Sequence, residues 1–372
     1  MASFSSVLDE IRNFEPTKQP AKEQPLIIYG AGGFGRDVAK ALLSEGYAVL
    51  GFLDRRGSNE VEGIPCRTLE ADLSDWLARD ATVLVGLHNY QVDPLPIRKE
   101  LLGFGFRRVL LTVEYFEMVE SKLGVRYWLG QRGIYRNHLE ELKALHDLLA
   151  DEKSRALLQA TLEYRALGRP EAQPVAQPHE SYFPTDIPRW TEPLHWVDGG
   201  ACDGDSLRAF PLDRYRCGNI YAFEPDPINY EKLQGTLRDF QQRSPQTQVD
   251  SWPCGLGKEP TILKFKTGLG LGSAASVEGE TECRIVPLDD TLVGRPVNFI
   301  KLDIEGAEPD ALLGAEKIIR EQKPGLAVCI YHTPAHLWEI PLQMAQRHPG
   351  YHFYLRCHGH SSFDLVLYAV RA

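Results

Sequence analysis

Short apolar runs alternate with segments of helical spacing in the first third of the chain. The runs at residues 25–29, 48–53, 81–87 and 108–112 have the length of buried strands. Between them, apolar residues recur at helical spacing in 36–45 and 97–102. Because alternating strands and helices are typical of parallel sheets, residues 25–118 are expected to form a small α/β domain. A polar arm, residues 1–24, precedes it.

Residues 119–193 have a different pattern. Leucines recur at helical spacing in 139–149, and apolar residues do so again in 156–164, so two helices are expected. From Pro170 to Pro193 a proline occurs every few residues, which prevents regular structure. This part of the chain is therefore predicted to be a helical connector followed by a proline-rich linker or lid.

The alternation returns in residues 194–372. Strands are expected at 195–197, 219–223, 247–252, 298–302 and 326–331. Two further β-rich segments, 351–356 and 365–370, are separated by a short polar loop, as in an antiparallel hairpin. The predicted fold class is therefore α/β, with an N-terminal Rossmann-like parallel sheet domain and a C-terminal, mainly parallel sheet domain that ends in a hairpin.

Composition narrows the possible partners. The 372 residues include 51 acidic and 41 basic side chains, a formal net charge of -10, so a polyanion such as nucleic acid is not the expected partner. No apolar run approaches the roughly 20 residues that cross a bilayer, and the first residues do not resemble a secretory signal. A membrane partner is therefore not expected. Seven scattered cysteines without a C-x-x-C pair suggest reduced thiols and a cytoplasmic location.

A first glycine-rich loop follows the first predicted strand. Gly30, Gly32, Gly33 and Gly35 have the G-x-G-x-x-G spacing, and Asp54 ends the next strand, where a ribose-binding carboxylate is expected. Such a loop lets a phosphate approach a helix N-terminus. The alternative is that the glycines serve only the packing of strand against helix.

This first segment resembles the N-terminal domain of sugar-nucleotide acyltransferases. The resemblance rests on Ile-Tyr-Gly-Ala-Gly-Gly-Phe-Gly-Arg-Asp-Val-Ala, on Gly51-Phe-Leu-Asp54 and on Val83-Leu-Val-Gly-Leu87. It implies a nucleotide or nucleotide-linked sugar as a ligand of this domain. The chain has no hexapeptide repeat, so acyl transfer is not implied.

A second glycine-rich loop follows the strand expected at 195–197. It runs from Asp198 to Ser206 with glycines at 199, 200 and 204, which is not the dinucleotide spacing. The loop resembles motif I of S-adenosylmethionine-dependent methyltransferases, in which the glycines let the backbone approach the cofactor. The cofactor-binding candidates are Asp198, Gly199, Gly200, Ala201, Asp203, Gly204, Ser206, Glu224, Pro225, Asp250, Ser251 and Asp303. Glu224 is placed to accept hydrogen bonds from both ribose hydroxyls, and Asp250 and Ser251 to meet the adenine ring.

Several ordered segments identify residues 140–372 as similar to the FkbM-type methyltransferases. They are Tyr182-Phe183-Pro184, Val197-Asp-Gly-Gly-Ala, Phe223-Glu-Pro, Pro287-Leu-Asp-Asp-Thr-Leu292 and Lys301-Leu-Asp-Ile-Glu-Gly-Ala-Glu308. The resemblance implies a seven-stranded Rossmann-like methyltransferase fold and S-adenosylmethionine as methyl donor. It also implies a hydroxyl oxygen as the acceptor, on a sugar, a glycan precursor or a natural product.

An alcohol is a poor nucleophile, so a general base within hydrogen-bond reach of the acceptor is expected. Candidates at the carboxyl ends of the later strands are Asp303, Glu305, His332, His336 and His358. His332 or Glu305 is the expected base, with Asp303 orienting the cofactor or the acceptor. A turn carboxylate or a hydrogen-bonded strand-end histidine is the alternative reading of each. No metal site is predicted, because no second metal-type cluster is evident, and a divalent ion held by Asp303 and another acid is left as an alternative.

Two other functions remain open from the sequence. The first glycine loop could serve an NAD-dependent oxidoreductase, although no Tyr-x-x-x-Lys pair follows it. The chain could also be a non-catalytic nucleotide-binding protein with two degenerate folds.

Overall fold

The computed structural model describes residues 3–15, 19–57, 60–265 and 281–371. By its internal contacts the chain divides into two compact units. The first comprises Met1–Glu140, Ala156–Ala176 and Gly359–Asp364, and the second comprises Glu141–Arg155, Gln177–His358 and Leu365–Ala372. Each unit is built from several separate segments of the chain. The domain boundaries expected at residues 24, 118 and 193 therefore stay a prediction.

The first unit contains a six-stranded sheet in the order β3-β4-β2-β1-β5-β6, and all neighbours except β3 and β4 pair in parallel. Its strands are β1 (Leu26–Tyr29), β2 (Val49–Leu53), β3 (Glu60–Val61), β4 (Ile64–Arg67), β5 (Thr82–Val85) and β6 (Arg108–Leu110). The four strands expected from the apolar runs are confirmed. The short pair β3 and β4 was not expected, because two and four residues are too few to show a period.

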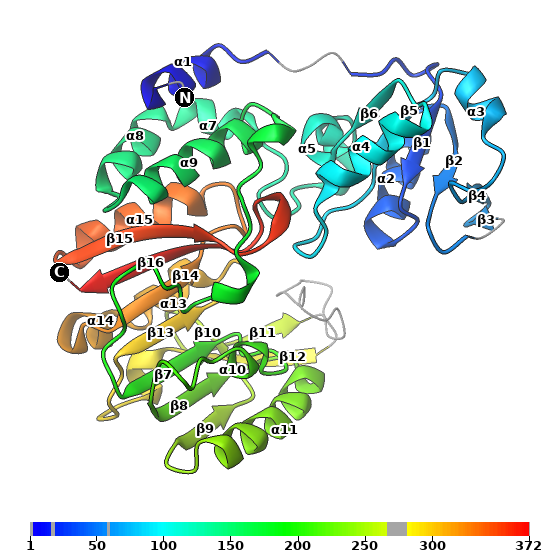
Figure 1. The fold of residues 1–372 in the computed structure, drawn as a ribbon. Coiled ribbons are helices and arrows are strands. Elements are labelled where there is room, and N and C mark those ends of the chain that lie inside the picture. Colours follow the sequence, from blue (N-terminus) through cyan, green and yellow to red (C-terminus); the bar gives the residue numbers. More distant parts are fainter. Residues whose placement is uncertain (1–2, 16–18, 58–59, 266–280, 372) are drawn as a thin grey trace. The chain divides into compact units, whose positions relative to one another are not determined.

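The first unit also contains helices (Figure 1). The two predicted from their spacing are α2 (Gly33–Ser44) and α4 (Pro94–Phe104). The others are α1 (Phe4–Arg12), α3 (Ser74–Ala78), α5 (Thr112–Tyr115), α6 (Glu120–Leu123) and α7 (Gly133–Asn137). The core gathers the apolar side chains of β1, β2 and β5 around Trp76, and Gly51 is required there because a Cβ atom would lie 2.8 Å from the indole ring.

The two leucine-spaced segments form α8 (Leu139–Leu148) and α9 (Glu152–Arg165), as predicted. The proline-rich residues 168–193 contain neither α-helix nor strand, but only the short 3₁₀ turns η2 (Pro170–Ala172) and η3 (Pro178–Glu180). Proline lacks the N–H that a helix or an inner strand needs, which accounts for this irregular path.

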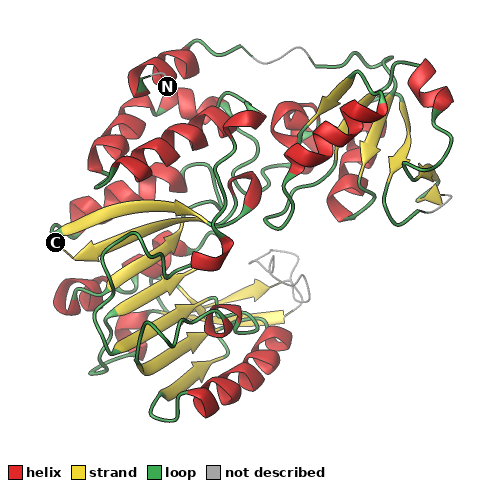
Figure 2. Ribbon diagram, in the orientation of Figure 1, coloured by secondary structure: helices red, strands yellow, loops and turns green. Residues whose placement is uncertain are grey.

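The second unit contains a seven-stranded sheet in the order β15-β16-β14-β13-β7-β8-β9 (Figure 2). Its strands are β7 (Leu194–Gly199), β8 (Cys217–Phe223), β9 (Gln248–Trp252), β13 (Phe299–Leu302), β14 (Gly325–Cys329), β15 (Tyr351–Cys357) and β16 (Leu365–Arg371). Five neighbouring strands run parallel, whereas β16 is antiparallel to both β14 and β15. The predicted fold class, including the seven strands and the terminal hairpin, is confirmed.

A small sheet, β10-β12-β11, lies in the same unit and was not expected from the sequence. Its strands are β10 (Gly255–Leu256), β11 (Thr261–Phe265) and β12 (Thr281–Val286). The helices of the second unit are α10 (Asp205–Arg208), α11 (Pro227–Arg243), α12 (Leu288–Thr291), α13 (Glu308–Leu313), α14 (Glu316–Gln322) and α15 (His336–Arg347). Within the described residues, no helix is both long enough and apolar enough to span a bilayer.

Candidate active site

The carboxyl end of β7 leads into the second glycine-rich loop, where a side chain at either of two glycines would clash with neighbouring atoms. Gly200 has φ +70°, and a Cβ atom on it would lie 1.9 Å from the carbonyl oxygen of Asp303. Gly204 has φ +86° and would bring a Cβ atom to 2.6 Å from the Thr236 side chain. Both φ values lie in the left-handed region that glycine tolerates, so the loop can fold back over the sheet edge.

Register places Lys301 of β13 directly beside Asp198 of β7. Both side chains are buried, with Lys301 Nζ 3.0 Å from Asp198 Oδ1. The ammonium also donates to the carbonyl oxygens of Gly199 and Gly200, and Ser206 Oγ donates to Asp198 Oδ2 over 2.8 Å. The carboxylate of Asp198, the first acid of the motif, therefore stabilises the loop through Lys301 and Ser206.

Burial alone would lower the pKa of Lys301. The negative charges of Asp198, Asp303 and Asp205 outweigh burial and raise that pKa above its ordinary value. Lys301 thus remains an ammonium ion, and its charge is needed to hold three carboxylates close to one another.

Glu224 follows β8 and closes the loop from the other side. Its Oε2 accepts a hydrogen bond from the Cys202 N–H over 2.7 Å, and its Oε1 accepts one from the Asp226 N–H over 2.8 Å. Burial raises the pKa of Glu224 to about 7. Since each carboxylate oxygen can accept more than one hydrogen bond, Glu224 retains acceptor positions for a ligand.

The remaining cofactor candidates lie around this loop. Ala201 and Ser206 are buried, while Asp203 is paired with Arg208 at the surface. Pro225 is half-buried between Glu224 and Asp226.

Asp250 and Ser251 lie on β9 and are also engaged within the chain. Asp250 is ion-paired with Arg295, and Ser251 Oγ lies 3.0 Å from both the Tyr230 hydroxyl and the Gln234 amide nitrogen. The structure brings this strand next to β8 as expected, but both side chains already have partners.

A second cluster of charged groups lies at the ends of β13 and β14. His332 Nε2 is 3.3 Å from Asp303 Oδ1 and 3.7 Å from Glu305 Oε2, and its Nδ1 is 2.9 Å from Glu308 Oε1. Asp303 also adjoins the glycine loop, because its backbone N–H donates to the Gly199 carbonyl oxygen. The structure therefore brings the three predicted catalytic residues together beside the loop.

The charges in this cluster act on one another. Burial would lower the pKa of His332, but Glu308 and Asp303 raise it well above its ordinary value. Burial would raise the pKa of Asp303, but His332 and Lys301 hold it well below its usual range. The two carboxylates thus favour the protonated imidazole of His332 in the ligand-free chain.

From the sequence, Tyr182 was quoted as part of the segment Tyr182-Phe183-Pro184, without an assigned role. Its hydroxyl donates to Asp303 Oδ2 over 2.9 Å, and its ring lies over the Lys301 ammonium. The backbone N–H of Tyr182 donates to the hydroxyl of Tyr368 on β16. Glu308 was likewise quoted as part of a motif without a role. The sequence could have pointed to both residues, because each places a polar group in an otherwise apolar or proline-rich segment.

The other two histidine candidates have structural partners. His336 Nδ1 lies 3.5 Å from Glu308 Oε2. His358 lies 2.8 Å from the Gln177 carbonyl oxygen and 2.7 Å from the Tyr368 hydroxyl, and burial lowers its pKa to about 4. His358 therefore supports the contact between Tyr368 and Tyr182.

In the first unit, the first glycine-rich loop and Asp54 also come together. Ala31 N–H donates to Asp54 Oδ2 over 2.8 Å, and Gly30 has φ +99°. A Cβ atom on Gly35 would lie 1.9 Å from the Gly30 carbonyl oxygen, whereas one on Gly32 or Gly33 would meet nothing within 4 Å. Packing therefore explains Gly35, while Gly32 and Gly33 leave open space at the N-terminus of α2.

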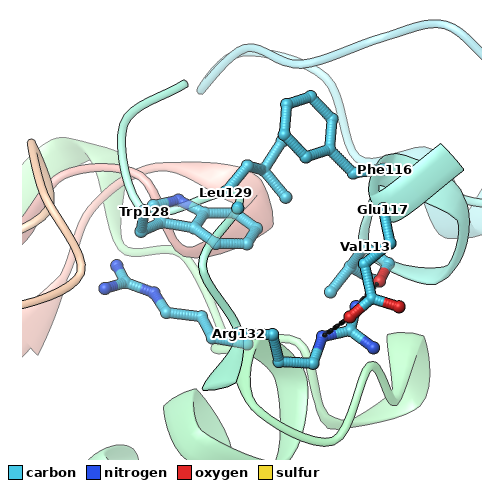
Figure 3. A pocket seen from close by; sticks show the side chains of 8 residues that line it. Val113, Phe116, Glu117, Trp128, Leu129 and Arg132 are labelled. Carbon is cyan, nitrogen blue, oxygen red and sulfur yellow. Dashed lines mark hydrogen bonds and ion pairs between the residues drawn. The ribbon is translucent and has the colours of Figure 1, made fainter. Parts of the chain in front are cut away.

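Figure 3 shows a small pocket elsewhere in the first unit, lined by Trp128, Leu129, Val113, Phe116, Glu117 and Arg132. Arg132 is ion-paired with Glu117 across it. None of the residues expected to bind a ligand lines this pocket, so the glycine-rich loops and not this pocket carry the candidate chemistry.

Comparison with known proteins gives two family matches. Residues 198–356 match the family model described as the methyltransferase FkbM domain, and residues 25–92 match the one described as the PglD N-terminal domain. No curated protein sequence matches the chain. Both resemblances seen in the sequence are thereby confirmed, and the methyltransferase domain supports S-adenosylmethionine as the cofactor.

A solved structure shares this fold. The methyltransferase FkbM of Methylobacillus flagellatus KT has a TM-score of 0.81 and 23% sequence identity, covering 99% of this chain and 98% of that chain. Fibrillarin of Aeropyrum pernix, solved with natively bound S-adenosyl-L-methionine, has a TM-score of 0.27 and 11% identity, over 48% of this chain and 67% of that one. The first match extends the shared fold over nearly the whole chain, whereas the second is too distant to support an argument.

Proposed function

We propose that this chain, whose residues 198–356 match the FkbM methyltransferase domain, is an S-adenosylmethionine-dependent O-methyltransferase. The acceptor is a hydroxyl group of a sugar, a glycan precursor or a natural product. The observation that carries the proposal is the buried carboxylate of Glu224, hydrogen-bonded across the glycine turn to the Cys202 N–H. The glycine turn and the Asp303 cluster both lie at the carboxyl edge of the sheet, where doubly wound folds bind ligands.

The residues present fit the cofactor. Gly200 leaves no room for a side chain and keeps the loop backbone close to the sheet edge. Glu224 retains acceptor positions for the two ribose hydroxyls. The excess of acidic groups around Lys301 suits a ligand with a positive charge. When bound, S-adenosylmethionine supplies a methyl group on a positively charged sulfur.

The chain's own residues have to orient the acceptor and accept its proton. As the new C–O bond forms, the C–S bond breaks and its electron pair stays on sulfur, so the positive charge disappears while the hydroxyl proton must leave. Glu305 is proposed as proton acceptor, because its carboxylate lies at the cluster beside the loop. Asp303 is proposed to orient the acceptor and is itself held by the Tyr182 hydroxyl. Alignment of donor and acceptor supplies much of the acceleration in such displacements.

The N-terminal domain is proposed to bind a nucleotide or a nucleotide-linked sugar and to present the acceptor. The match to the PglD N-terminal domain supports this assignment, as does the open space at Gly32 and Gly33 where α2 begins. A helix N-terminus with free N–H groups favours a phosphate. The scattered cysteines of the sequence support a cytoplasmic location for the reaction.

Calorimetry tests the donor assignment. S-adenosylmethionine is expected to bind the wild-type chain, and Glu224→Ala is expected to weaken binding at least about tenfold, since two charge-assisted hydrogen bonds are lost. The exposed Glu321 provides the matched control, and Glu321→Ala should bind like the wild type. Absence of binding by the folded wild-type chain would overturn the proposal, as would binding that Glu224→Ala leaves unchanged.

A second experiment tests the acceptor class. The chain is incubated with methyl-labelled S-adenosylmethionine and panels of sugars, nucleotide sugars and polyhydroxylated natural products. Label in an O-methyl product supports the proposal, and the same product should be lost in Glu305→Gln. Label that appears only on nitrogen, sulfur or carbon atoms of these acceptors would contradict O-methylation while leaving the methyltransferase assignment intact.

A further inference from the structure

The cluster that ends β13 and β14 combines donors of the kind that metal ions bind. Asp303, Glu308 and His332 each offer a ligand atom, and these atoms lie within 4.8 Å of one another. Glu305 Oε2 lies on the Nε2 side of the same imidazole, 3.7 Å away. We propose that Asp303, Glu305 and His332 Nε2 bind a divalent cation of the Mn²⁺ class, and that Glu308 positions the histidine.

The separations between donors fit one ion. Protein ligands lie about 2.0–2.2 Å from a divalent transition ion, so two adjacent ligands are roughly 3–3.6 Å apart. His332 Nε2 lies 3.3 Å from Asp303 Oδ1 and 3.7 Å from Glu305 Oε2. Both separations from the imidazole nitrogen thus lie within about 0.1 Å of the range expected for two ligands of one ion. One imidazole nitrogen with two carboxylates is a mixed donor set that suits Mn²⁺, Fe²⁺ or Zn²⁺ better than Ca²⁺.

Glu308 has the place of a positioning residue. Its Oε1 lies 2.9 Å from His332 Nδ1, the ring nitrogen that points away from Asp303 and Glu305, and it also accepts a hydrogen bond from the Ile304 N–H. Histidines that bind metals usually donate their other ring N–H to such a carboxylate, which fixes the tautomer and the ring. Asp303 is fixed in the same way, because the Tyr182 hydroxyl donates to its Oδ2 over 2.9 Å. Its Oδ1 faces the ion site and also accepts a longer hydrogen bond, 3.4 Å, from the Tyr331 hydroxyl.

The excess of negative charge around this cluster in the second unit also favours a bound cation. Five carboxylates gather here, and the basic groups among them are Lys301, His332 and His336. The carboxylates are those of Asp198, Asp205, Asp303, Glu305 and Glu308. Glu308 Oε2 is buried and lies 3.5 Å from His336 Nδ1. Buried negative charge in excess is costly unless a cation offsets it, and a divalent ion does so at this position.

The site is open on one side only. The side chains of Asp303 and Glu305 are 24% and 20% exposed, whereas those of His332 and Glu308 are 2% and 0% exposed. A ligand can therefore reach the ion past the two carboxylates. The role of the ion toward the acceptor rests on the proposed function. The ion would bind the hydroxyl oxygen and lower the pKa of that hydroxyl, and Glu305 would accept the proton on the carboxylate oxygen that does not face the ion.

Mn²⁺ binding to the full chain tests the site without any methyl transfer. After dialysis against a chelator, the chain is titrated with Mn²⁺, and free Mn²⁺ is measured by electron paramagnetic resonance. One tightly bound ion per chain is expected, displaced by Zn²⁺ and bound in the absence of S-adenosylmethionine. Glu305→Ala and Glu308→Gln should each weaken binding about 10–100-fold, the first by loss of a ligand and the second by loss of the positioning contact.

The chain offers a matched control in a second histidine–carboxylate pair. Glu316 Oε2 lies 3.5 Å from His348 Nε2, but Arg347 already supplies a positive charge at 3.8 Å. Glu316→Ala should therefore bind Mn²⁺ like the wild type. Thermal unfolding of each variant establishes that it is folded, and added Mn²⁺ should raise the unfolding temperature of the wild type and of Glu316→Ala.

Two results would overturn the inference. One is failure of the folded wild type to bind Mn²⁺ or Zn²⁺ stoichiometrically, and the other is binding that neither Glu305→Ala nor Glu308→Gln weakens. If methyl transfer persists after chelation and no ion binds, the metal site is wrong and the methyltransferase assignment stands. If Mn²⁺ binds as described but S-adenosylmethionine does not, the metal site stands and the proposed function fails.

Discussion

Glu224 accepts a hydrogen bond from the backbone N–H of Cys202, 2.7 Å away, and so ties the end of β8 to the glycine turn after β7. The contact joins residues 22 positions apart, and it makes the shape of the loop depend on one buried carboxylate. The ionisation of that carboxylate therefore affects any ligand in the loop.

Cofactor affinity is expected to rise with pH around neutrality. Burial raises the pKa of Glu224 to about 7, and only the ionised carboxylate accepts hydrogen bonds from both ribose hydroxyls with all its lone pairs. Below that pKa the competent fraction falls, so affinity for S-adenosylmethionine should decrease by up to about tenfold per pH unit. Calorimetry between pH 5.5 and 8.5 measures this slope, and Glu224→Gln should flatten it. A wild-type profile that is already flat would remove Glu224 from the cofactor site.

The same carboxyl group has an opposite effect on stability in the ligand-free chain. Because its folded-state pKa is raised above the ordinary value of 4.5, the folded chain holds a proton that the unfolded chain releases. Its contribution to the free energy of unfolding is present below pH 4.5 and is lost as pH rises toward 7. Urea unfolding of wild type and Glu224→Gln across this range should show a difference that grows with pH. A constant difference would contradict the raised pKa.

Loss of Lys301 should destabilise the chain strongly. Lys301→Met leaves Asp198 buried without its cation, and breaking one partner of a buried pair costs about 3–5 kcal/mol. Asp198→Asn in the same chain should recover part of that loss, because the unpaired charge is removed as well. Denaturant unfolding of the two single variants and the double variant measures the coupling. Additive losses would show that the pair does not act as a unit.

Alanine substitutions at the glycines of the first loop should differ in their effect on stability. Gly35→Ala forces a Cβ atom against the Gly30 carbonyl oxygen and should destabilise the first unit, whereas Gly32→Ala meets nothing within 4 Å and should leave stability almost unchanged. Thermal unfolding compares the two. If Gly32→Ala also leaves the binding of every nucleotide and nucleotide sugar unchanged by calorimetry, the loop serves packing alone.

Tyr182→Phe should separate cofactor binding from catalysis. The substitution keeps the ring over Lys301 and removes the hydrogen bond to Asp303, a bond to a charged group that contributes about 1.5–3 kcal/mol. We expect kcat to fall about 10–100-fold with little change in the affinity for S-adenosylmethionine. Loss of cofactor affinity with unchanged kcat would assign Tyr182 to the cofactor instead.

The sequence was informative where a pattern is local. Apolar runs and helical spacing predicted the main strands, the helices and the terminal hairpin, because each depends only on residues near one another in the chain. The acids that follow the strands were expected near the glycine loop for the same reason, and the structure has Glu224 and Asp303 there. Their roles in binding and catalysis stay predictions. Short elements such as β10, β11 and β12 were missed, since their two to six residues carry no clear period.

Partners distant in sequence could not be predicted in this way. Lys301 lies beside Asp198 only because β13 pairs with β7, and no local feature of either strand specifies that neighbour. His332 illustrates the same limit, because its position after a strand suggested a base but the three carboxylates around it come from another segment. The order of strands in the sheet decides both, and it is a property of the folded domain.

The antiparallel strand β16 has a consequence for how the second unit is made. It is the last of the seven strands along the chain, yet it lies between β14 and β15 in the sheet. As the ribosome extends the chain, β14 and β15 therefore emerge with bare edges and wait for the strand that joins them. Exposed edges of this kind attract other chains, so the nascent protein is most prone to aggregation just before residues 365–371 are added.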